Sequence, residues 1–194
     1  SPYFVDPAAA WQQINVTMQE HLQAQHGQFL QQTQKALRRT AGTPPPALGQ
    51  ELSYDYKIAY YAPHLVSLLA TVQERTVDDH LNTGYASMHF QVQDDKAIPL
   101  TLTDIFFPGS PYVETLSAYC LSTLHKKVAS AAGLTNHFQV NDLQAFTVSP
   151  TGLTFAFAPY QVGVAGVESF FVTVPYHVLA KVLKAEGPLG HTKK

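Results

Sequence analysis

The sequence predicts an α+β fold, an antiparallel β-sheet with helices packed mainly on one face. Apolar residues recur at helical spacing near the N-terminus and again from Tyr112 to Val128, whereas residues 52–60 and 85–93 alternate between apolar and polar side chains. The predicted elements therefore follow the order helix, strands, helix, strands, helix. That order favours an antiparallel sheet with its helices gathered on one side.

The first helix is expected to begin at Asp6-Pro7, because aspartate caps helices and proline fits their first turn. Its apolar stripe consists of Trp11, Ile14, Met18, Leu22, Phe29 and Leu37, and glutamines fill the other faces. We expect this amphipathic helix to lie on the sheet, with a partner-binding coiled coil as the alternative. Gly27 should weaken its middle.

The proline run Pro44-Pro45-Pro46 predicts a stiff extended connector and the only internal boundary. The chain then divides into three predicted parts. Residues 1–43 are an N-terminal amphipathic helical segment packed on the main domain, residues 50–187 are the α+β domain itself, and residues 188–194 are a flexible tail.

Four strands are predicted before the second helix. Residues 52–60 form a half-buried strand that ends at Ala62-Pro63, and residues 64–74 form a central strand that is apolar on both faces. A polar loop is expected from Asp78 to Gly84. In the next strand, Ser87, His89 and Gln91 share the polar face. The Asp94-Asp95 pair makes a turn, and a strand resumes over 98–102.

The C-terminal half begins with the most regular helix. Ser110-Pro111 starts it and Gly133 should end it. Its buried stripe is Tyr112, Leu116, Tyr119, Cys120, Leu124 and Val128. Residues 146–148 and 153–157 flank a hairpin turn at 149–152, and residues 170–174 form the last strand. Pro175 opens a short helix in which Leu179, Val182 and Leu183 are expected to be buried.

Composition narrows the class of protein. Charged residues make up 13% of the chain, against about 25% in ordinary globular proteins, a bias that is commoner in exported proteins. The net charge is −2 with no basic run, which argues against a nucleic-acid partner. No apolar stretch is long enough for a transmembrane segment. The chain begins with Ser1 rather than Met, as expected after removal of a signal or anchor, or after trimming.

Motifs for chemistry are lacking. The nine histidines do not show metal-ligand spacing, and Asp78-Asp79-His80 is better explained as a solvated loop than as a metal site. Cys120 lies on an apolar stripe, so we expect a buried, unreactive thiol. No serine-nucleophile or phosphate-binding motif occurs. We therefore expect no catalytic residue, no cofactor and no metal, although paired carboxylates for glycoside hydrolysis stay conceivable.

Tyrosine is the notable excess. The predicted neighbouring strands carry Tyr54, Tyr56, Tyr60, Tyr61 and Tyr85. Aromatic rings with polar tips suit a surface that binds carbohydrate or protein. Ordinary packing within the sheet is the alternative.

The C-terminal half resembles a known family. Residues 146–160, from Phe146-Thr147-Val148 through the Ser149-Pro150-Thr151-Gly152 turn to Ala158-Pro159-Tyr160, resemble the C-terminal block of the RsiV-like, DUF3298-type family, as do residues 172–176. Residues 100–106 are similar to its strand and short helix, and Ile14-Asn15 resembles the DUF4163-type helix that often precedes it. The resemblance implies an α+β fold and an exported location at the bacterial cell envelope. It implies no shared chemistry.

These observations predict a non-catalytic, secreted or envelope-associated domain that recognises a protein (lysozyme-like) or a cell-wall glycan such as peptidoglycan. A structural or assembly subunit of the envelope is the alternative, and a polysaccharide hydrolase a further one. The loops 78–84 and 160–168 depart from the family pattern, and loops tolerate change most readily. The candidate partner-binding residues are Tyr85, Tyr160, His80 and Asn82.

Overall fold

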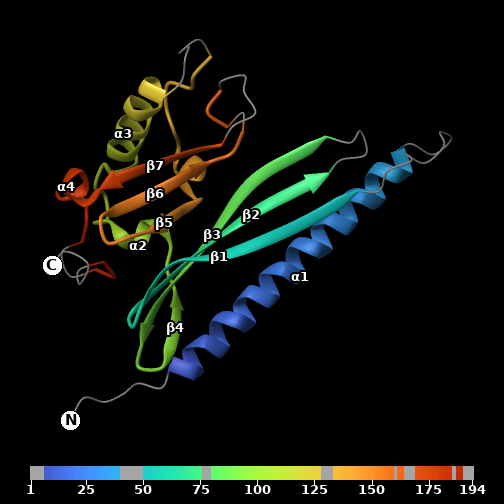
Figure 1. The fold of residues 1–194 in the computed structure, drawn as a ribbon, viewed down its shortest axis with the longest axis horizontal. Helices are drawn as coiled ribbons and strands as arrows, with labels where there is room; N and C mark the ends of the chain where they lie inside the picture. The colour runs from blue at the N-terminus through green and yellow to red at the C-terminus, as the bar shows by residue number, and fades with distance from the viewer. Residues whose placement is uncertain are drawn as a thin grey trace.

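A computed structural model describes residues 7–39, 50–75, 80–127, 133–159, 161–163, 169–184 and 187–189. The α+β class is confirmed, and the strands are divided between two antiparallel sheets (Figure 1). The first sheet contains β1 (Glu51–Ala62), β2 (Leu65–Arg75), β3 (Leu81–Gln93) and β4 (Lys96–Pro99) in that order. The second contains β5 (Phe146–Val148), β6 (Gly152–Phe157) and β7 (Phe170–Pro175). The helices are α1 (Pro7–Arg39), α2 (Leu102–Ile105), α3 (Tyr112–Lys127), α4 (Tyr176–Leu179) and a 3-10 turn at Val140–Leu143.

Helix α1 runs along the first sheet (Figure 1), as the amphipathic pattern predicts. Ile14 is buried in a small core with Val66 and Phe90 of the sheet, and Trp11 stacks on Tyr61 at 5.5 Å between ring centroids. Gly27 does not end the helix, because packing on the sheet outweighs its low helix propensity. The expected aspartate cap at position 6 and the proline connector lie outside the described residues.

Strand β2 lies between β1 and β3, as its two-sided apolar pattern predicts. The expected single apolar face of β1 is wrong at its end, because a β-bulge falls between Ile58 and Tyr60. The extra residue reverses which way the later side chains point. Ile58 is 61% exposed, Tyr60 packs against the core of the second sheet, and Tyr61 contacts α1 instead.

Strand β3 begins earlier than the sequence suggests. The predicted polar loop is wrong for residues 81–84, because β3 pairs with β2 without interruption from Leu81 opposite Arg75 to Gln91 opposite Leu65. Residues 78 and 79 lie outside the described part of the chain. The Asp94-Asp95 turn is confirmed, and both residues have positive φ, 47° and 64°, as a tight two-residue hairpin requires.

The resumed strand is shifted relative to the expectation of residues 98–102. Strand β4 begins at Lys96, directly after the turn, and ends at Pro99. Leu102 already starts α2, where the Asp104 carboxylate accepts a hydrogen bond from the Thr101 backbone N–H at 2.8 Å. This capping box competes with further strand pairing and stops the hairpin.

The main core lies between α3 and the second sheet. Leu116, Cys120 and Leu124 of α3 are fully buried, together with phenylalanines of β5 and β6. The hairpin β5–β6, the last strand and the burial of Leu179, Val182 and Leu183 are all as predicted. Residues 128–132, which include Val128, are outside the described part of the chain.

Cys120 is a buried free thiol, as its place on the stripe predicts. Burial raises the pKa of this thiol to about 12, because a thiolate cannot be solvated in the core. Its lack of reactivity stays a prediction. Within the described residues, no helix combines the length and apolar character needed to cross a membrane.

We expect Leu124→Ala to lower the free energy of unfolding by about 2–5 kcal/mol, because it removes buried methyl groups and leaves a cavity. Ser122→Ala, at an exposed position of the same helix, is the control and should change stability little. Urea denaturation of both variants measures the difference. Equal midpoints for the two variants would contradict the packing described.

Candidate functional site

A buried polar cluster joins the two sheets. Within it, Ser67 of β2 and Ser87 of β3 lie on either side of the His89 ring, and we call these three residues the Ser67–His89–Ser87 cluster. His89 Nδ1 lies 3.0 Å from Ser67 Oγ, and His89 Nε2 lies 3.1 Å from Ser87 Oγ. The polar face of β3 that the sequence suggests is exposed is therefore buried here, since His89 is 4% exposed.

The cluster binds the outer edge of β5. The backbone N–H of Val148 donates to Ser67 Oγ at 3.1 Å, and that of Phe146 donates to Ser87 Oγ at 3.2 Å. The His89 ring also lies 4.0 Å from the Phe146 ring, centroid to centroid. Two serine hydroxyls thus replace the neighbouring strand that β5 lacks on this side.

The donors of the cluster fix one histidine tautomer. Ser87 donates its only hydroxyl proton to the Gln144 carbonyl at 2.9 Å, so it accepts from His89 Nε2–H. His89 Nδ1 then carries no proton and accepts from the Ser67 hydroxyl. The neutral ring with its proton on Nε2 satisfies every hydrogen bond in the cluster.

Protonation of His89 is unfavourable in this setting. Burial lowers the pKa of His89 from its ordinary 6.5 to about 4, because the charged ring would lose its hydration. A proton on Nδ1 would also displace the Ser67 hydroxyl hydrogen from its acceptor. The cluster therefore lacks the features of a serine–histidine catalytic pair, since both hydroxyls and both ring nitrogens are already engaged within the fold.

Most edges of the two sheets are protected from further pairing. Strand β1 carries charged residues and a bulge, and β4 is only four residues long and ends in Pro99. The outer edge of β5 binds the serine cluster. On β7, the ammonium group of Lys127 donates to the Phe171 carbonyl at 2.8 Å.

In the part of the chain that the structure describes, the first half of β3 has no such protection. Strand β4 pairs only with residues 90–93, and the Leu100 N–H donates to the His89 carbonyl at 2.8 Å just beyond. Because alternate residues of a strand face the same edge, the backbone groups of residues 81, 83, 85 and 87 point away from β2. Among the described residues no strand pairs with them. We call the outward backbone groups of Leu81, Thr83, Tyr85 and Ser87 the β3 open edge.

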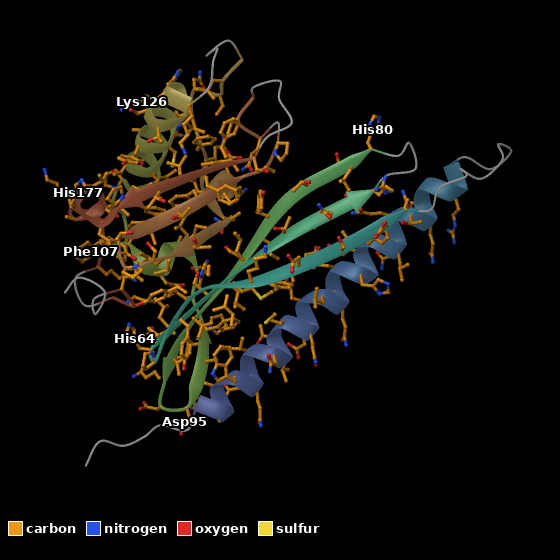
Figure 2. All side chains as sticks on the ribbon, in the orientation of Figure 1. His64, His80, Asp95, Phe107, Lys126 and His177 are labelled. Carbon is orange, nitrogen blue, oxygen red and sulfur yellow. The ribbon has the colours of Figure 1, made fainter. Side chains whose placement is uncertain are left out.

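Apolar side chains flank the β3 open edge on the side of the second sheet. The Tyr85 ring meets Phe171 of β7 edge-to-face at 5.3 Å between centroids. Phe171 remains 43% exposed and Leu81 52% exposed. Figure 2 shows His80 at the tip of β3, beside the start of this edge.

A hollow borders the edge on the side of α1. It has a volume of about 210 Å³, and Thr17, His21, Met88 and Pro99 are among its lining residues. Gly84 also lies on this side, and no atom is within 4 Å of the position that a Cβ would take. A second strand laid along β3 would therefore find open space on one side and an aromatic pair on the other.

Three of the four predicted partner-binding residues lie at the start of β3 but do not form one surface. His80 directly precedes the strand, and Asn82 and Tyr85 lie within it on opposite faces, so Asn82 is in a strand rather than in a loop. Tyr160 lies outside the described residues. The predicted tyrosine surface is otherwise divided, because Tyr54 and Tyr56 stack on each other under α1 while Tyr60 packs in the core.

Sequence reasoning missed Phe171 and the Ser67–His89–Ser87 cluster. A serine–histidine alternation looks like an exposed polar face, and nothing local to β3 shows that β5 will cover it. For metals, the described part of the chain contains no group of three or more His, Cys, Asp or Glu residues placed to hold an ion. Residues 78 and 79 of the acid–histidine run are not described.

Residues 103–177 match the family model described as "Protein of unknown function (DUF3298)". This match to the DUF3298 family agrees with the resemblance that the C-terminal half of the sequence predicts. The finer likeness to RsiV-like proteins and to the DUF4163-type helix stays a prediction. No functionally curated protein matches the chain.

Two solved structures of DUF3298 proteins share the fold. The crystal structure of a family member from Bacteroides fragilis has 16% identity and a TM-score of 0.60, and the match covers 94% of this chain and 72% of the other. That of a family protein from Pseudomonas aeruginosa has 17% identity and a TM-score of 0.57, with 77% and 76% covered. Both matches extend well beyond residues 103–177, so the shared fold is larger than the matched family segment.

Stability should depend on pH through His89. Its folded pKa lies below the unfolded value, so the folded state takes up fewer protons between pH 4 and 6.5 and stability falls as the pH falls through that window. The full loss is about 3 kcal/mol. Denaturation of the protein and of His89→Gln at pH 7 and pH 4.5 measures it. An equally steep pH dependence in the variant would show that His89 is not responsible.

Amide hydrogen exchange should alternate along β3. The N–H groups of Gly84 and Ala86 bond to β2, whereas those of Thr83 and Tyr85 belong to the β3 open edge. We expect the second pair to exchange about a hundredfold faster or more, as measured by NMR. Equal protection of neighbouring residues would mean that another segment covers the edge.

Proposed function

We propose that this chain, whose residues 103–177 match the DUF3298 family, is a non-catalytic binding domain of the bacterial cell envelope and that its ligand is a protein. The observation that carries the proposal is the β3 open edge with its aromatic flank. An unprotected strand edge beside exposed apolar side chains is uncommon in proteins that have no partner there.

A protein fits this site better than a glycan. The outward N–H and C=O groups repeat at the spacing of a polypeptide backbone, which a sugar chain does not reproduce. Tyr85 and Phe171 meet edge-to-face, so they offer a step rather than the flat ring surface on which sugars stack. Protein interfaces commonly use such partly exposed aromatic anchors.

The burial and hydrogen bonding of Ser67, Ser87 and His89 support a non-catalytic role. Ser67 and His89 are buried, and Ser87 accepts from a backbone N–H while donating to a carbonyl. A nucleophile needs a free hydroxyl and an accessible base, and this cluster provides neither. The hydrolase alternative thus finds no support in these residues.

Location at the envelope rests on two features of the sequence. The low charged fraction of 13% is commoner in exported proteins, and the C-terminal half resembles exported domains. An exported domain can bind envelope proteins directly, and a lysozyme-like protein is one candidate ligand. The proposal includes Tyr160 as a further residue that contacts the protein ligand.

We expect Tyr85→Ala to weaken binding of the protein ligand about thirtyfold or more, since truncating an aromatic anchor typically costs at least about 2 kcal/mol. The ligand is retrieved from envelope extract with the immobilised protein, identified, purified and titrated, and lysozyme and purified peptidoglycan are titrated separately.

Phe107→Ala is the matched control, because Phe107 is another exposed aromatic residue and lies far from His80 and the open edge (Figure 2). It should leave the affinity unchanged. Binding of peptidoglycan alone, or equal affinities for the Tyr85 and Phe107 variants at unchanged melting temperature, would overturn the proposal.

A further inference from the structure

We infer that the β3 open edge takes up an extended, uncharged segment of the partner protein as an additional β-strand. The inference rests on the proposed function and specifies how the partner is held. In this arrangement the backbone groups of Leu81, Thr83, Tyr85 and Ser87 form the hydrogen bonds, and the flanking side chains select the sequence.

The contrast among the sheet edges supports this assignment. The other edges are each protected: β1 by charged residues and a bulge, β4 by its short length and a proline, β5 by the serine cluster, and β7 by the lysine contact. Residues 81–87 contain no charged residue and no proline, and their register with β2 is unbroken. Open, flat and uncharged edges favour pairing with another chain. A fold that protects its other edges keeps this one available.

The residues on the two sides of the β3 open edge determine which side chains the added strand can have. Side chains of an added strand alternate between the two sides. One set meets Leu81, Tyr85 and Phe171, so apolar or aromatic residues fit there. The other set meets Gly84 and the hollow by Thr17, where small to medium side chains fit. Charged residues would lose hydration against the apolar side chains on the side of the second sheet.

The decisive variant is Thr83→Pro. The Thr83 N–H faces away from β2, so proline removes a donor of the open edge without breaking the β2–β3 ladder. Thr83→Val keeps that N–H and is the control. Denaturation midpoints of both variants verify that the sheet is intact.

The probe is a displayed library of random linear peptides about twelve residues long, selected on the wild-type protein. We expect selected peptides that lack proline and alternate apolar residues. A synthetic copy should bind Thr83→Pro at least about tenfold more weakly and Thr83→Val within about twofold. Alternate amides of the bound peptide point towards β3, and the others point away from it. N-methylation of the amides that point towards β3 should abolish binding, and N-methylation of the others should leave binding unchanged.

In the experiments with peptides and with the protein alone, three results would overturn the inference. These are that every selected peptide binds Thr83→Pro as tightly as wild type, that N-methylation weakens binding in neither register, or that the protein forms a dimer that Thr83→Pro abolishes. The last result assigns the edge to a second copy of the chain. If the envelope protein still requires Tyr85 while Thr83→Pro binds it normally, strand addition is wrong and the proposed function stands. If no envelope protein binds, both fail.

Discussion

The docking of β5 onto the first sheet is the contact that determines how the rest of the molecule is arranged. A strand of three residues at the edge of its sheet has two outward N–H groups, on Phe146 and Val148, and burying them without partners would be costly. The Ser67–His89–Ser87 cluster supplies both acceptors, and the neutral imidazole holds the two hydroxyls in place. The two sheets are therefore joined by a polar contact with a single arrangement of protons, surrounded by aromatic packing.

This contact also explains why β3 is covered over one part of its length and open over another. At His89 the strand faces β5 on one side, and beyond it β4 closes the edge. Before Ser87, the described residues place the Tyr85–Phe171 contact beside β3, and no described strand pairs with its outer edge. Strand β3 is thus held in place by β4 and β5 in its second half and has an open edge in its first half. Such a combination suits binding, because a preorganised edge loses little conformational freedom when a partner pairs with it.

The sequence was informative wherever a pattern depends on neighbours along the chain. The stripe through Leu116 and Leu124, the 149–152 turn and the two-sided burial of β2 all follow from local spacing. The features that could not be predicted from the sequence depend on contacts between residues that are far apart in the chain. The bulge near Tyr60 changes the face of later side chains, and pairing with β2 holds Asn82 in a strand despite its preference for turns. The burial of His89 and the nearness of Phe171 to Tyr85 likewise require the second sheet, which no pattern within β3 reveals.

The most direct test of the account is a double-mutant cycle on Ser67→Ala and Ser87→Ala, with the free energy of unfolding measured for both single variants and the double variant. Because both serines hold the same imidazole ring and the same strand, we predict that the effects are not additive and that the coupling is about 1 kcal/mol or more. Loss of either serine leaves the His89 ring poorly oriented. The second serine substitution should therefore lower the free energy of unfolding by less in that variant than it does in the wild-type protein. Additive effects would contradict the account, because they would mean that the two serines act independently and that His89 does not link the sheets.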